Sequence, residues 1–346
     1  MSVVLALGGD VVVTRPLTRA LAKPGAQRFL EEVRHANAAI ANLEIPLCET
    51  GAAVEKFVTH RASPSLAQDL AECGFRTLVL ANNHACDYGL EGLMETMGHL
   101  RRAGITPLGA GRNLTEALAP THIQGDGATV ALLAVSALLP AGCGATGDRA
   151  GIAPLRVDTR YEIDPAILME QPGNPPNVRT SVRADDLNRL CAVVAAARDS
   201  ATHVVVYVHW GVGLQQARAE YQQPLGHALV DAGADLVVGC HPHAIQQIER
   251  YGNGFIFYNL GECFSQYDPT AFPPSVAALL TQIRPEGMLL KASFGAGRPP
   301  RLELIPLAID REGDPSTDDA ERVVEKIRSM CEAPVRFAEG SFILET

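Results

Sequence analysis

The stretch LVDAGADLVVGCHPH, residues 229–243, joins the end of a helix to a buried strand and then to a pair of histidines. Helical periodicity over Leu225–Ala232 stops at Gly233, a residue that suits the left-handed C-terminal turn of a helix. The apolar run Leu236–Val238 is typical of a strand covered on both faces. A helix followed by such a strand is the repeating unit of an α/β fold, and His241 and His243 come directly after it.

The same alternation extends to both sides of this stretch. Short apolar and β-branched runs predict further strands at Val3–Leu7, Ala38–Leu43, Thr77–Leu80, Val130–Val135, Val204–Val208 and Phe255–Tyr258. Helical periodicity occurs at Pro64–Cys73, Glu91–Ala103 and Arg183–Arg198, and Gly74 and Gly104 follow the first two as helix stops. The pattern therefore predicts an α/β fold without internal repeats.

The chain has 346 residues, 47% of them apolar, which is ample for a buried core, and we expect a single domain over residues 1–346. Residues 140–180 are rich in glycine and proline and lack periodicity, so we expect a long loop there. The C-terminal part, residues 285–346, predicts two strands within Leu289–Ile309 and a closing helix at Asp318–Cys331.

The formal net charge of −10 argues against nucleic-acid binding, because phosphate backbones are captured by clustered lysine and arginine. The apolar N-terminus reaches Asp10 too early for a signal peptide or a membrane span. The eight cysteines are scattered singly, as expected of free thiols in a reducing compartment. We therefore expect a cytoplasmic protein without a membrane span.

Five of the predicted strands are each followed by polar residues that can bind metal, one after each of four strands and two after the fifth. These residues are Asp10, Glu44, Asn83, His209, and the pair His241 and His243. In open α/β sheets the carboxyl ends of strands converge on one crevice, where carboxylates can bridge two cations while imidazole and amide groups complete each shell. Taken singly, each residue could instead cap a turn or satisfy a backbone carbonyl, but the set as a whole favours a site for one or two ions of Mn, Fe or Zn.

Three segments carry a resemblance to a known family. They are ANLEIPLCETG from Ala41, LANNHACDYGLEGLMETMGHLRRAGITPLGAGRN from Leu80, and the region from HWG at His209 to FYNLGECF ending at Phe264. They resemble the CapA, or poly-γ-glutamate biosynthesis, family of the calcineurin-like metallophosphoesterase superfamily. The resemblance implies a β-sandwich core flanked by helices.

The resemblance also assigns roles to individual residues. The six residues at the strand ends match the family's metal ligands, with Glu44 in the bridging position, and His84 matches a nearby acid. Asp10 and His243 are further acid or base candidates. Supporting or substrate-facing positions fall on Asn42, Asn82, Asp87, Trp210, Glu262, Lys56 and Arg61. One departure is Val12, which stands where the superfamily has a histidine ligand.

The family resemblance and the metal ligands together imply an enzyme that acts on the amide bond of a peptide or a glutamate polymer. Polarisation of the carbonyl by metal can lead to hydrolysis or to epimerisation at Cα, and the sequence leaves both open. Two alternatives are an accessory protein of polyglutamate or capsule synthesis that binds polymer without turnover, and a phosphoesterase. The sequence also leaves the oligomeric state open.

Overall fold

The computed structural model describes residues 2–125, 127–318 and 320–344, and its elements alternate between strand and helix as the sequence predicts. The larger sheet has the strand order β19 (Val335–Ala338), β20 (Ser341–Leu344), β17 (Arg301–Ile309), β16 (Glu286–Phe294), β1 (Val3–Val12), β2 (Ala38–Leu43), β3 (Phe75–Val79) and β4 (Thr106–Leu108). Strand β15 (Glu262–Ser265) pairs with β1, and β18 (Pro315–Ser316) pairs with β17. Strands β1 to β4 run parallel, so their carboxyl ends share one edge.

A second sheet packs face to face with the first. Its order is β13 (Ile248–Tyr251), β14 (Gly254–Phe257), β12 (Leu236–Cys240), β11 (His203–His209), β7 (Ala128–Ser136) and β6 (Thr121–Gly125). Strands β14, β12, β11 and β7 run parallel to one another, so β11 and β12 also end at one edge.

The core between the sheets follows from the alternation of side chains along each strand. Leu5 and Leu7 of β1 point inward and meet Val205 and Tyr207 of β11, while Ala6 joins the outer cluster beneath the helices. The result is a β-sandwich.

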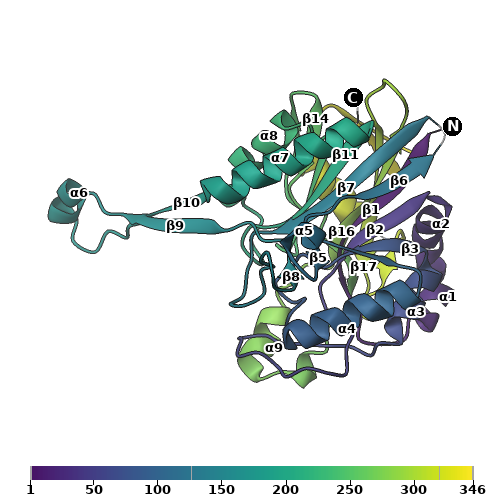
Figure 1. Cartoon of the computed structure of the whole chain (residues 1–346), viewed down its shortest axis with the longest axis horizontal. Coiled ribbons are helices and arrows are strands. Elements are labelled where there is room, and N and C mark those ends of the chain that lie inside the picture. Colours follow the sequence, from purple (N-terminus) through teal and green to yellow (C-terminus); the bar gives the residue numbers. More distant parts are fainter. Residues whose placement is uncertain (1, 126, 319, 345–346) are drawn as a thin grey trace.

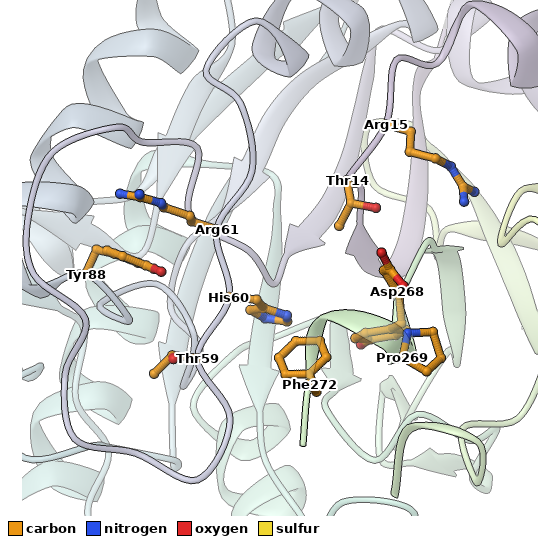
Figure 2. Close-up of a pocket in the computed structure, with 10 residues that line it drawn as sticks. Thr14, Arg15, Thr59, His60, Arg61, Tyr88, Asp268, Pro269 and Phe272 are labelled. Atoms are coloured by element: carbon orange, nitrogen blue, oxygen red, sulfur yellow. The ribbon is translucent and has the colours of Figure 1, made fainter. Parts of the chain in front are cut away.

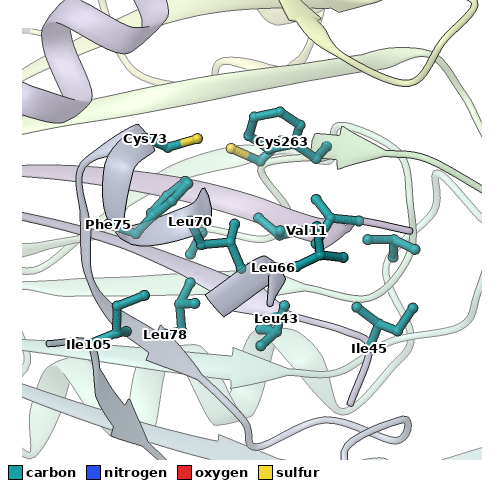
Figure 3. Close-up of a cluster of buried hydrophobic side chains, with 14 of the residues drawn as sticks. Val11, Leu43, Ile45, Leu66, Leu70, Cys73, Phe75, Leu78, Ile105 and Cys263 are labelled. Carbon is teal, nitrogen blue, oxygen red and sulfur yellow. The ribbon is translucent and has the colours of Figure 1, made fainter. Parts of the chain in front are cut away.

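Helices cover both outer faces of the sandwich (Figure 1). On the larger sheet lie α2 (Gln27–His35), α3 (Leu66–Cys73) and α4 (Gly89–Arg102), and on the second sheet lie α7 (Ala184–Ser200) and α8 (Gln222–Asp231). Figure 3 shows how Leu66 and Leu70 of α3 pack on Val11, Leu43 and Leu78 of the sheet. Further helices are α1 (Thr18–Ala22), α5 (Leu114–Ala117), α9 (Pro274–Leu280) and α10 (Glu321–Met330). The predicted helix at Asp318–Cys331 is therefore present but shorter.

The predicted loop at 140–180 is wrong for its second half. Strands β9 (Val157–Glu162) and β10 (Asn177–Val182) pair as an antiparallel ribbon, with α6 (Pro165–Glu170) at the far end, and this arm projects away from the body (Figure 1). The first half contains β8 (Gly151–Ile152), which pairs with β5 (Ala110–Gly111). The arm is held by hydrogen bonds between its two strands and has no buried apolar face. Its strands therefore lack the apolar pattern from which strands were predicted in the sequence.

Candidate metal centre

All six residues predicted as metal ligands lie at the carboxyl-end edge of the two sheets. Asp10 lies near the end of β1, Glu44 directly follows β2, and Asn83 lies in the turn after β3. His209 ends β11, and His241 follows β12. The face-to-face packing of the sheets turns both sets of strand ends toward one crevice, as the strand-end pattern predicts.

An irregularity in β1 aims Asp10 into this crevice. The pairing of β1 with β2 shifts register between Leu7 and Asp10, and the backbone N–H of Asp10 donates to the Gly261 carbonyl over 3.0 Å. A Cβ atom at Gly9 would lie only 1.9 Å from that same carbonyl oxygen. Glycine is therefore required at position 9 for the close approach that places Asp10.

Glu44 occupies the middle of the ligand cluster. Its Oε1 atom lies 3.4 Å from His209 Nε2, 3.7 Å from His241 Nδ1 and 3.9 Å from His243 Nε2. Among the described residues neither oxygen of this fully buried carboxylate has a hydrogen-bond partner, and nor does His241 Nδ1. Buried polar atoms are normally paired, so these orphaned atoms mark a place for a cation.

Asn83 joins the same group, because its Oδ1 lies 2.7 Å from His209 Nε2. Carboxylate, imidazole and amide donors within reach of one point suit a divalent metal of intermediate softness.

A second group of potential ligands adjoins the first. His243 Nδ1 lies 2.6 Å from Glu262 Oε1 and 3.6 Å from Asp10 Oδ2. Strand β15 carries Glu262 into place, since its parallel pairing with β1 sets Glu262 opposite Asp10. Glu262 Oε2 is also buried without a partner among the described residues.

The close packing of carboxylates and imidazoles shifts the pKa values of both groups. Burial and the neighbouring Glu44 carboxylate raise the pKa of Asp10 well above its usual value. Burial would lower the pKa of His243, but the carboxylates of Glu44, Glu262 and Asp10 outweigh it and raise the pKa to about 10. Burial lowers the pKa of His241 to about 3, so this imidazole is neutral and able to bind metal.

The backbone around the histidines is strained. His241 has a φ of 101° and His243 a φ of 51°, both in the left-handed region that side chains other than glycine rarely adopt. The N–H of His241 donates to Asp10 Oδ2 over 3.0 Å, which helps to hold this turn. Such strain concentrates at functional sites, where the surrounding structure enforces it.

His84 stands beside the cluster with its orientation fixed. Its Nδ1 lies 2.7 Å from Asp87 Oδ2, and the Lys56 ammonium lies 2.7 Å from the other oxygen, Asp87 Oδ1. Burial alone would raise the pKa of Asp87, but the hydrogen bond from His84 and the Lys56 charge hold it below its ordinary value. An ionised Asp87 accepts the Nδ1 proton of His84, which leaves Nε2 free for exchange with a substrate.

The other predicted residues have structural contacts. Asn42 Nδ2 donates to Asp10 Oδ1 over 2.8 Å, and Asn82 bridges Asn42 Oδ1 and the Leu43 carbonyl. Trp210 is fully buried and donates to the Tyr258 carbonyl, away from the ligand atoms.

Two cavities meet at His60 and Tyr267 beside the centre. The outer pocket, of about 610 Å³, is lined by polar and aromatic residues that include Arg15, Arg61 and Tyr88 (Figure 2). Arg61 stacks over the Tyr88 ring at 4.4 Å and donates to the Glu49 carbonyl. The inner chamber, of about 260 Å³, includes Asn83, His84, His241 and His243 in its lining.

Sequence reasoning missed several neighbours of the centre. Cys240 gives no sign of a role in the sequence, yet its Sγ lies 3.4 Å from His209 Nδ1. The proximity of Glu262 to Asp10 depends on the pairing of β15 with β1, which no local motif reveals. The apolar walls of the inner chamber come from three separate segments whose residues look like ordinary core positions in the sequence.

The sandwich and its strand-end ligands define a calcineurin-like metallophosphoesterase fold. A phosphatase from Mycoplasma pneumoniae, known from its crystal structure, shares the fold with a TM-score of 0.50 and 11% identity, over 94% of this chain and 97% of that one. The family model for the bacterial capsule synthesis protein PGA_cap matches residues 4–267. The chain therefore belongs to the PGA_cap family.

Two relatives are the PGA biosynthesis protein CapA of Bacillus subtilis and the capsule biosynthesis protein CapA of Bacillus anthracis. The first is 28% identical over 260 residues, which cover 73% of this chain and 60% of the relative. The second is 30% identical over 211 residues, which cover 60% of this chain and 44% of the relative. The chain thus spans about half of these relatives' own length. Within its described residues, none of its helices has both the length and the apolar character needed to cross a membrane.

Proposed function

We propose that this chain is a metal-dependent enzyme that acts on an amide bond of a peptide or of a glutamate polymer. The observation that carries the proposal is Glu44, a buried carboxylate with no partner among the described residues, surrounded by three imidazoles. A carboxylate left this way is costly unless a cation neutralises it.

Two metal positions account for the donors. The first would be held by Glu44, Asn83, His209 and His241, and the second by Asp10, His243 and Glu262, with Glu44 shared between them. In this arrangement Glu262 stands in for the histidine that Val12 replaces. When bound, a divalent ion such as Mn, Fe or Zn supplies Lewis acidity that polarises a substrate carbonyl.

His84 is the residue we assign to proton transfer. Asp10 accepts hydrogen bonds on both oxygens, from Asn42 and from the His241 N–H, and His243 Nδ1 lies against Glu262 and Asp10, so we assign both to holding metal. His84 faces the inner chamber with Nδ1 bound to Asp87. In hydrolysis His84 Nε2 delivers a proton to the leaving nitrogen, and in epimerisation it exchanges a proton at Cα.

Lys56 and Arg61, proposed as substrate-facing residues, differ in their freedom to contact substrate. Lys56 Nζ donates to the Asn83 carbonyl over 2.6 Å and to Asp87, so we assign it to holding the His84 turn. Arg61 lines the outer pocket, where its planar guanidinium could bind a carboxylate of the substrate chain.

The test is incubation of metal-loaded protein in deuterated water with a peptide library and with γ-glutamyl oligomers, followed by mass spectrometry. Chain cleavage establishes hydrolysis, and a gain of one mass unit without cleavage establishes proton exchange at Cα. Both activities should disappear with a chelator and in a His84→Ala variant that retains its metal.

Three outcomes would contradict the proposal. Polymer that binds without any product would establish the accessory role instead. Cleavage of p-nitrophenyl phosphate with no action on amides would establish a phosphoesterase, and amide turnover that survives complete removal of metal would exclude the metal-dependent mechanism.

A further inference from the structure

The inner chamber has both polar and apolar residues in its lining. Four of them belong to the candidate metal centre and its acid: Asn83, His84, His241 and His243. The rest of the lining is mostly apolar side chains from three segments: Phe57 and Val58 from the loop before His60, Leu214 from the loop after β11, and Leu279, Leu280 and Ile283 from α9 and the turn that follows it. These residues come together only in the folded chain.

The size of the chamber limits what can enter. At about 260 Å³ it is smaller than the pockets of roughly 300 to 1,000 Å³ that enclose drug-sized ligands. It can therefore take one bulky side chain beside the reacting group, while the rest of the substrate extends into the outer pocket, which shares His60 and Tyr267 with it.

The apolar walls of the chamber disfavour a carboxylate side chain there. The Lys56 ammonium of the lining is already engaged by Asp87. A carboxylate side chain would lose its hydration against the apolar walls. A branched or aromatic side chain would instead bury apolar surface.

Leu214 adds an independent indication that the apolar wall is functional. Its φ of 64° lies in the left-handed region, where leucine is strained and glycine is not, and its N–H is held by the Pro242 carbonyl over 3.0 Å. The loop thus holds a bulky apolar side chain at the chamber in a backbone conformation that disfavours it.

We propose that the substrate is a peptide with a bulky apolar residue next to the reacting amide, whose side chain fills the inner chamber. This inference rests on the proposed amide chemistry and narrows its substrate class from peptides and glutamate polymers to apolar peptides. Arg15 and Arg61 line the outer pocket, which is the place for the polar continuation of that peptide.

The experiment measures binding, which does not depend on turnover. Blocked tripeptides of the form acetyl-Gly-X-Gly-amide, with leucine, phenylalanine, alanine or glutamate at X, are titrated into metal-loaded protein by isothermal titration calorimetry. The leucine and phenylalanine peptides should bind about tenfold or more tightly than the alanine peptide, because the chamber buries their extra apolar surface. The glutamate peptide should bind most weakly.

Two substitutions by glycine in the loop after β11 test whether the preference for apolar peptides arises at the chamber wall. Leu214→Gly removes part of the wall and relieves the strained backbone, so the protein should fold and keep its metal while losing several-fold affinity for the leucine peptide but not for the alanine peptide. Val212→Gly is the matched control, since Val212 is 45% exposed and does not line the chamber. It should change neither affinity.

Equal binding of the four peptides, absence of binding, or tightest binding of the glutamate peptide would overturn the inference. The outcomes also separate it from the proposed function. If the protein binds apolar peptides preferentially but forms no product, the inference about the chamber holds and the proposed enzymatic function fails. If the protein turns over amides without a preference for the side chain, the enzymatic function holds and the inference fails.

Discussion

At the scale of single residues, the candidate ligands could be predicted from the sequence and their supporting contacts could not. Asp10, Glu44 and the three histidines were predicted because each follows a strand, and the structure brings them together. Glu262 was predicted only as a supporting or substrate-facing residue, and its place beside His243 and Asp10 depends on a pairing between β15 and β1, which are distant in the sequence. Local pattern predicts which residues end a strand, whereas tertiary pairing decides which strand ends meet.

We predict that Glu262→Gln lowers the number of bound metal ions from two to one. The substitution removes a negative charge from the group with Asp10 and His243 and leaves the group around His209 unchanged. Metal content after dialysis against a weak chelator measures the effect. Glu249→Gln, a carboxylate paired with His227 outside the centre, should keep both ions. Two ions retained with unchanged affinity in the Glu262 variant would show that this carboxylate is not a ligand.

Asp186 provides a stability prediction away from the centre. It is buried and accepts hydrogen bonds from the Arg156 backbone N–H and guanidinium. Although burial raises its pKa, these bonds outweigh burial and hold the pKa below the ordinary value. Asp186→Asn should therefore reduce the free energy of unfolding by about 1–3 kcal/mol at neutral pH.

The pH dependence of this loss follows from linkage. A depressed folded-state pKa contributes stability above the unfolded pKa of about 3.9, and that stability is lost as the pH falls through the folded value. The difference between wild type and variant in urea denaturation should be constant from pH 6 to 7 and shrink below about pH 4. A difference that grows with acid would contradict the assigned ion pair.

At the scale of elements, buried strands were predictable from their continuous apolar runs, and helices from their periodicity and the glycines that end them. The predicted strand Ala38–Leu43 coincides with β2, and the predicted stops Gly74 and Gly104 have φ values of 116° and 77°. The β9–β10 ribbon was missed, because its sequence has few apolar residues and its strands bury no core. The turn and helix signals therefore worked only where an element packs against the sandwich.

The two glycine stops make a matched pair of substitutions. At Gly104 a Cβ atom meets no atom within 4 Å, so Gly104→Ala should cost only the left-handed backbone, about 1 kcal/mol. At Gly74 a Cβ atom would lie 3.0 Å from Arg34 Cγ and 3.1 Å from Val33 Cγ1, so Gly74→Ala should cost more. Urea denaturation of both variants measures the difference. Equal losses, or a larger loss at position 104, would contradict this account of the helix ends.

At the scale of the whole molecule, the sandwich carries the site and the arm is separate from it. All residues from 159 to 179 are exposed, and they include large apolar side chains: Tyr161, Ile163, Ile167, Leu168, Met169 and Val178. The arm is tied to the body through Glu220, which accepts from the Thr180 N–H and pairs with Arg179. The fold class followed from the sequence, but the separation of arm and body did not.

We predict that the arm can be shortened without loss of the fold or of the metal centre. Replacing residues 160–179 by Asn-Gly would close a tight hairpin between Thr159 and Thr180, which are paired in the ribbon. Because the removed residues bury no core, the melting temperature should change by no more than about 2 °C, which is the order of shift that 1 kcal/mol produces in a chain of this size. Unfolding of the shortened protein would show that the arm is part of the core of an assembly, and size-exclusion chromatography would then reveal a changed oligomeric state.

The central claim is that the crevice between the two sheets binds divalent metal, and metal content is its most direct test. Inductively coupled plasma mass spectrometry should find up to two equivalents of Mn, Fe or Zn in the untagged protein. At least one equivalent should be lost from each of the Asp10→Ala and His241→Ala variants, and the full complement should be kept in His122→Ala, whose imidazole contacts Ser200 away from the site. Wild-type protein that remains free of metal after loading with Mn or Zn, or variants that keep a full complement, would contradict the account.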